Sequence, residues 1–92
     1  MPLAVHPGRI LRREMIARKL SANRLALDLG VPSGRITDIV NGKRGITADT
    51  ALRLGRRLGT SAQFWMNLQT RHDLIVAEEK LGRRLTTEVR AA

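Results

Sequence analysis

The sequence has no cysteine and no tyrosine, and only one phenylalanine and one tryptophan. Without cysteine, disulfides and cysteine-based metal or thiol sites are excluded, and the composition fits a reducing compartment such as the cytoplasm. No apolar run approaches the ~18 residues that a membrane span needs, and the apolar stretch at the N-terminus is too short for a signal peptide. We therefore expect one small cytoplasmic domain without a membrane partner, whose core consists mainly of leucine, isoleucine and valine.

Acidic residues are also scarce. The chain has 17 lysines and arginines against 8 acids, and its formal net charge is +9. Residues 1–20 and residues 42–60 each carry a net charge of +4, whereas residues 21–41 are neutral. This balance favours a polyanionic partner, although a solvated basic surface without a specific partner would have the same composition.

The neutral segment contains the pattern of a helix-turn-helix within residues 25–42, LALDLGVPSGRITDIVNG. Leu25 and Leu29 belong to one apolar face of a short first helix. Gly30 follows at the point where a chain leaving a helix often needs a positive φ, and Pro32 presets the backbone for a new helix. In a helix-turn-helix the second helix enters the major groove of DNA.

Helical periodicity continues along the rest of the chain, without a strand pattern or an internal repeat. Ser21 is expected to cap the second helix and Thr47 the fourth, which should bury Leu52. Thr60 and Gln63 have the spacing of a capping box that starts the fifth helix. The five helices are expected at residues 9–19, after Ser21, after Pro32, at residues 48–58 and at residues 62–81.

These patterns predict an all-α fold, namely a five-helix helix-turn-helix DNA-binding domain similar to phage repressors, with a long C-terminal helix. The expected organisation is an N-terminal arm at residues 1–8, a domain at residues 9–81 that includes the reading unit 22–41, and a flexible tail at residues 82–92.

The outward face of the second helix of the reading unit supplies candidates for reading base edges. These candidates are Ser33, Gly34, Arg35, Thr37 and Asp38. Arg35 is the strongest because a guanidinium can pair bidentately with guanine; the alternative is an ion pair with Asp38 on its own helix. Asp38 could orient an arginine, accept from cytosine or be only a solvated carboxylate. Gly34 weakens a helix, so it either permits close approach to DNA or is incidental.

A second group of residues flanks the reading helices and suits contacts to DNA phosphates. These residues are Ser21, Asn23, Asn41, Lys43, Arg44 and Thr47. Ser21 and Asn23 lie at a helix N-terminus, which favours anions; the alternative, which applies to Asn23 in particular, is that each is only a capping residue. Arg53, Arg56 and Arg57 are weaker candidates, because their helix is expected to face away from DNA.

The fifth helix has more apolar residues than a five-helix core needs, which suggests a homodimer. The candidate interface residues are Trp65, His72, Leu74 and Leu81. No nucleophile, base and orienting group come together in the sequence, so we expect no enzyme activity, no metal and no cofactor. His6 is expected to be a local capping group, and His72 an interface or half-buried residue.

Three blocks resemble HigA-type antitoxins of type II toxin–antitoxin modules, in the Xre-like helix-turn-helix family. The blocks are HPGRIL at residues 6–11, NGKRGITADTALRL at residues 41–54 and FWMNLQTRHDL at residues 64–74. The resemblance covers almost the whole chain, and the three blocks together are highly specific.

The resemblance implies a dimeric DNA-binding antitoxin. Such a protein would neutralise a HigB-like mRNA-cleaving toxin by direct binding, and would repress its own operon from a palindromic operator in the nucleoid. Two alternatives stay open: a stand-alone transcriptional repressor without a toxin partner, and a toxin-binding protein that has lost operator binding. The short ends of the chain suggest that a toxin would dock on a folded surface.

Overall fold

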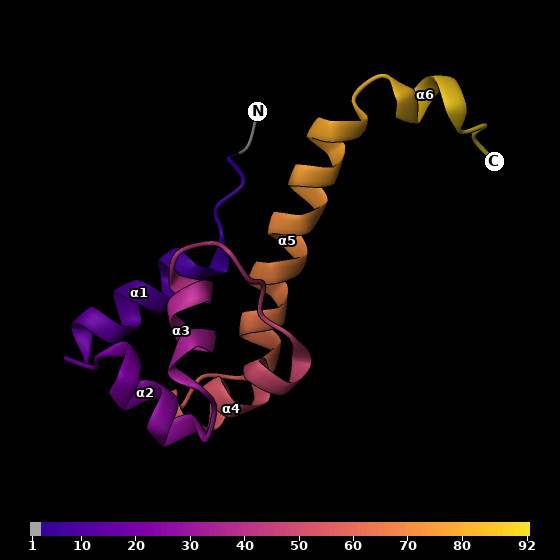
Figure 1. Ribbon diagram of the computed structural model, residues 1–92. Coiled ribbons are helices and arrows are strands. Elements are labelled where there is room, and N and C mark those ends of the chain that lie inside the picture. The colour runs from indigo at the N-terminus through magenta and orange to yellow at the C-terminus, as the bar shows by residue number, and fades with distance from the viewer. Residues whose placement is uncertain (1–2) are drawn as a thin grey trace.

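The computed structural model describes residues 3–92, which form six helices and no strand (Figure 1). The helices are α1 (Pro7–Ala17), α2 (Ala22–Leu29), α3 (Ser33–Val40), α4 (Ala48–Leu58), α5 (Ala62–Leu81) and α6 (Arg84–Glu88). Helices α1 to α4 and the first part of α5 form a compact body, from which the rest of α5 projects (Figure 1). The predicted all-α fold with a long C-terminal helix is therefore confirmed.

Polar side chains fix the starts of α2 and α4 as expected. The hydroxyl of Ser21 accepts from the backbone N–H of Arg24 at 3.1 Å. The hydroxyl of Thr47 accepts from the N–H of Thr50 at 3.4 Å. Each bond satisfies one of the N–H groups that the first turn of a helix leaves without an intrahelical partner.

The start of α5 differs from the prediction. Its N-cap is Ser61, whose hydroxyl accepts from the N–H of Phe64 at 3.0 Å. The hydroxyl of Thr60 instead accepts from the indole N–H of Trp65 at 2.8 Å. The capping box of Thr60 and Gln63 is therefore wrong, because the threonine satisfies a buried indole rather than a helix end.

The first helix begins two residues earlier than expected. His6 is its N-cap, and the ring Nδ1 accepts from the N–H of Gly8 at 2.9 Å, which confirms the capping role. Pro7 occupies the first turn, where its missing N–H costs nothing. Gly8 is buried, and a Cβ on it would collide with the backbone oxygen of Ile39 in α3. Residues 1–2 of the predicted arm lie outside the described residues.

The core is built mainly of aliphatic side chains around one tryptophan. Its buried members are Leu11, Met15, Leu25, Ala26, Leu29, Ile36, Ile39, Ile46, Ala51, Leu54, Leu58 and Trp65. Leu52 was expected among them but is 65% exposed. The inward face of α4 follows Ala51, Leu54 and Leu58 at helical spacing, and this leaves Leu52 on the opposite side.

The C-terminal part of the chain is more regular than expected. Helix α6 occupies part of the predicted flexible tail, and an ion pair of 3.0 Å joins Arg84 to Glu88 within it. The projecting part of α5 leaves Leu74 58% and Leu81 36% exposed. Among residues 3–92, no helix combines the length and apolar character that crossing a membrane requires.

Candidate nucleic-acid interface

The turn between α2 and α3 has the geometry that its sequence predicts. Gly30 ends α2 with φ 72°, a left-handed conformation that glycine adopts at least cost. The N–H of Val31 donates back to the carbonyl of Ala26 at 3.0 Å. Pro32, with φ −62° and ψ 143°, then forms the N-cap of α3. The turn therefore brings α2 and α3 together, and α3 turns Ile36 and Ile39 towards the core.

The predicted base-reading residues lie together on this outer face of α3. Ser33, Gly34 and Thr37 are exposed, and Arg35 and Asp38 are half-buried. A Cβ added to Gly34 would meet no atom within 4 Å. The chain's own packing therefore does not require glycine at this position.

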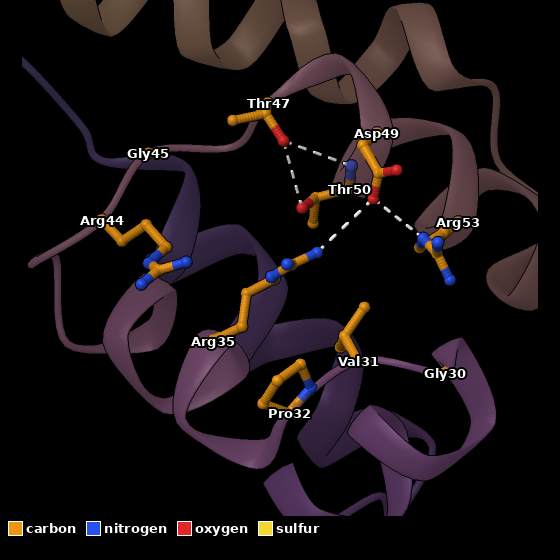
Figure 2. A pocket seen from close by; sticks show the side chains of 10 residues that line it. All are labelled: Gly30, Val31, Pro32, Arg35, Arg44, Gly45, Thr47, Asp49, Thr50 and Arg53. Carbon is orange, nitrogen blue, oxygen red and sulfur yellow. Dashed lines mark hydrogen bonds and ion pairs between the residues drawn. The ribbon is translucent and has the colours of Figure 1, made fainter.

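The side chain of Arg35 crosses from α3 to α4, as Figure 2 shows. Its Nη1 lies 3.4 Å from Oδ1 of Asp49, in the first turn of α4. Asp38 pairs instead with Arg44 of the following loop, at 3.9 Å. The alternative of an ion pair between Arg35 and Asp38 is therefore wrong. Of the three roles left open for Asp38, that of orienting an arginine matches its contact with Arg44.

Two of the arginines of α4, Arg53 and Arg57, contact α2. Nε of Arg53 donates to Oδ1 of Asp49 at 2.8 Å, and its Nη1 donates to the carbonyl of Leu29 at 2.8 Å. That carbonyl lies at the C-terminal end of α2, where carbonyls lack intrahelical partners. Arg57 likewise donates to Asp28 of α2 at 2.9 Å. These contacts fit the expectation that Arg53 and Arg57 are weaker candidates for phosphate binding than the residues of the loop.

The candidate phosphate residues form two groups on either side of α3. Ser21 and Asn23 are exposed at the start of α2, and Asn23 borders a depression that Ser33 also lines. Asn41, Lys43, Arg44 and Thr47 are exposed along the segment from the end of α3 to the start of α4. Both groups are therefore accessible to a ligand that contacts α3.

A hollow of about 240 Å³ joins α3 to the second group (Figure 2). Three arginines line it, Arg35, Arg44 and Arg53, with Asp49 as the one carboxylate among the lining residues. Thr47 lies on its rim, and its hydroxyl is occupied by the cap bond and by a contact of 3.3 Å with the hydroxyl of Thr50. The hollow is therefore open and positively charged.

Gln69 of α5 anchors the loop that carries Lys43 and Arg44. Its side-chain oxygen accepts from the N–H of Ile46 at 2.6 Å, and its amide nitrogen donates to Asp73 at 2.9 Å. A Cβ on Gly45 would come within 3.0 Å of the Gln69 amide. Sequence analysis did not single out Gln69, because its partner lies 23 residues away and no local pattern marks the contact.

The two histidines meet although they are far apart in the sequence. The rings of His6 and His72 pack edge to face with centroids 4.9 Å apart, and Nδ1 of His72 lies 3.3 Å from Asp73. Burial lowers the pKa of His6 below its usual 6.5, and the nearby His72 lowers this pKa further. Asp73 and a hydrogen bond with the backbone of Arg44 act in the opposite direction on the same pKa.

Two of the four candidate dimer residues are buried or half-buried within their own chain. Trp65 is fully buried in its own chain, which corrects the expectation that it contacts a second subunit. The side chain of His72 is 20% exposed and packs on His6, so it corresponds to the half-buried alternative. Leu74 and Leu81 remain exposed on α5, and Leu74 borders a shallow groove of about 520 Å³.

Comparison with known proteins supports the assignment of a helix-turn-helix to this chain. A family model described as Helix-turn-helix matches residues 11–65. Virulence-associated protein I from Dichelobacter nodosus is 54% identical over 77 residues, which make up 83% of this chain and 71% of that protein.

Two solved structures are similar over nearly the full chain. An addiction module antidote protein of the HigA family from Coxiella burnetii is 46% identical, with a TM-score of 0.94 over 99% of this chain and 100% of the other. The antitoxin HigA from Pseudomonas aeruginosa, solved with the higBA promoter, is 44% identical, with a TM-score of 0.92 over 96% of this chain and 97% of the other.

Proposed function

This chain belongs to the helix-turn-helix family and is HigA-like, and we propose that it is an antitoxin that binds operator DNA and represses its own operon. The observation that carries the DNA-binding part is the outer face of α3, with accessible polar residues between two groups of phosphate candidates. A homologous HigA was solved with promoter DNA, and its fold matches along almost the whole chain.

Base reading and phosphate binding would be divided between different residues. Ser33, Gly34, Arg35, Thr37 and Asp38 of α3 would lie against base edges in the major groove. Ser21, Asn23, Asn41, Lys43, Arg44 and Thr47 would hold the sugar-phosphate backbone on either side. Phosphate contacts supply register and salt-dependent affinity, whereas base contacts supply sequence preference.

The DNA-bound form would be a homodimer on a palindromic operator. Leu74 and Leu81 are exposed on the part of α5 that projects from the body, where a second copy could cover them. Two recognition helices related by a two-fold axis would then meet half-sites about 34–36 Å apart. A protein acting in this way would be located with the nucleoid in the cytoplasm.

The antitoxin part of the proposal concerns a HigB-like, mRNA-cleaving toxin. It is supported by the similarity to HigA structures along almost the whole chain, rather than by any one residue. The toxin would dock on a folded surface, with α1 and α5 as the two candidates.

Two experiments test the two parts of this proposal separately. Fluorescence anisotropy should show tighter binding to the duplex upstream of the protein's own gene than to a scrambled duplex of equal composition. Co-expression with the adjacent reading frame should give a complex that co-purifies and should rescue growth from the toxin. DNA binding without rescue would identify a stand-alone repressor, and rescue without DNA binding would identify a toxin-binding protein only.

A further inference from the structure

One carboxylate oxygen links the base-reading helix to the rest of the domain. Oδ1 of Asp49 accepts from Nε of Arg53 at 2.8 Å and from Nη1 of Arg35 at 3.4 Å (Figure 2). Arg53 is itself fixed by its bond to the carbonyl of Leu29. Helices α2 and α4 therefore fix the position of this carboxylate through Arg53. The carboxylate in turn contacts Arg35, which belongs to α3.

The contact leaves most of the Arg35 guanidinium available. A guanidinium carries five N–H donors in a fixed plane, and only one nitrogen, Nη1, touches Asp49. A bidentate contact to guanine needs two parallel N–H groups. The edge formed by Nε and Nη2 can supply them while Nη1 stays on the carboxylate.

We propose that Asp49 is a specificity-determining positioning residue, which holds the guanidinium of Arg35 in the orientation that reads a base. This inference rests on the proposed DNA-binding function. Arginine has many rotamers, and ordering such a side chain before binding saves entropy that would otherwise be lost in the complex. Asp49 thus acts through Arg35 and does not itself touch the DNA.

Two simpler roles of Asp49 make different predictions. An acid in the first turn of a helix interacts favourably with the helix dipole, and Asp49 and Arg53 form a pair at i, i+4. Both roles concern the stability of the domain, so their loss would weaken binding to every DNA sequence alike. A positioning role concerns the ratio of affinities for operator and scrambled DNA.

The test substitutes Asp49→Asn and measures this ratio at two salt concentrations. We expect the ratio to fall roughly 2- to 10-fold, which is the cost of ordering one flexible side chain. Affinity for scrambled DNA should stay the same or rise, because a negative charge has been removed. Asp49 has a 59% exposed side chain, so the variant should fold, and circular dichroism checks this.

Asp28→Asn is the matched control. Asp28 also contacts two arginines, Arg57 at 2.9 Å and Arg24 at 3.3 Å, and its loss changes the net charge equally. Neither arginine lies on α3. The ratio should therefore be unchanged in this variant.

A double-mutant cycle with Arg35→Ala identifies the route of the effect. Asp49→Asn should have no further effect on the ratio once Arg35 is absent. An equal fall in that background, or an unchanged or higher ratio in the single variant, would overturn the positioning role while the proposed function stands. A wild-type protein that does not distinguish the two duplexes would overturn both.

Discussion

Arg35 is the strongest of the proposed base-reading residues of α3, because a guanidinium can pair bidentately with guanine. It is 29% exposed and held at its tip by a residue of another helix, so its guanidinium is partly ordered before any DNA arrives. We expect Arg35→Ala to cost about 1–3 kcal/mol of binding free energy on the operator and to relax preference at one base pair. Titration of operator variants changed at single positions measures both effects.

Lys43→Ala is the corresponding control for a phosphate contact. Lys43 is exposed in the loop after α3, and removal of its charge should weaken operator and scrambled DNA alike. The slope of log affinity against log salt should decrease in magnitude by about one. If Arg35→Ala behaves in this way as well, its assignment to a base is incorrect.

We expect His6 to make the stability of the domain depend on pH. Its Nδ1 must be unprotonated to accept from Gly8, and its ring contacts His72, near Asp73 and the backbone of Arg44. The folded-state pKa lies below 6.5, so between these two pKa values the unfolded chain binds more protons at this site. The stabilisation by neutral His6 is therefore complete above pH 6.5 and is lost as the pH falls towards the folded-state pKa.

We expect His6→Asn to flatten this dependence. Asparagine keeps a side-chain oxygen that can cap α1 but does not titrate. Thermal unfolding between about pH 7.5 and about pH 5 should therefore show a larger loss of stability for the wild type than for the variant. Parallel curves would mean that His6 does not contribute to the pH dependence.

Two glycines within helices differ in the space that surrounds them. A Cβ at Gly8 of α1 would collide with the backbone of Ile39, whereas a Cβ at Gly34 of α3 would meet open space. We expect Gly8→Ala to destabilise the fold by about 1–3 kcal/mol through overpacking. Gly34→Ala should stabilise it by up to about 1 kcal/mol through helix propensity.

Chemical denaturation of both variants measures these changes in unfolding free energy. The same Gly34→Ala protein also decides between the two interpretations of that glycine. Loss of operator affinity in a more stable protein would indicate close approach of the backbone to DNA. Unchanged affinity would mean that the glycine is incidental.

Most helix ends could be predicted because their causes are local. Ser21 and Thr47 cap their own helices, Gly30 ends its helix with a positive φ, and α5 spans the predicted residues 62–81. The errors arise where long-range packing decides. The hydroxyl of Thr60, which was expected to cap α5, instead binds the indole of Trp65, which is buried in the core.

The outer face of α3 also followed from the sequence, because helical periodicity alone assigns it. The network of polar contacts behind that face could not be predicted from the sequence. Asp49 and Gln69 bind partners 14 and 23 residues away, and no local spacing indicates which of several charged or polar residues will meet. Trp65 was misplaced for the same reason, since periodicity groups apolar residues without showing which of them face the core.

The whole molecule is elongated, with extents of 48 × 22 × 21 Å, because α5 continues beyond the body that its first turns help to form. Its projecting part carries Leu74 next to Ile75, beside a shallow groove. Exposed apolar residues gathered on one helix favour a contact with another chain. The proposed recognition surface on α3 lies on the body, so pairing through α5 would join two bodies without covering α3.

We expect Leu74→Glu to weaken the homodimer at least about tenfold, because burial of one leucine contributes about 1.5–3 kcal/mol. Ile16→Glu is the matched control: Ile16 is 68% exposed, but it lies one helical turn from Arg12 and Arg13 on α1. Sedimentation equilibrium measures dimerisation, and anisotropy measures operator binding. The Leu74 variant should lose operator affinity because only a dimer spans both half-sites, while each body stays folded. A Leu74 variant that remains dimeric would place the interface elsewhere.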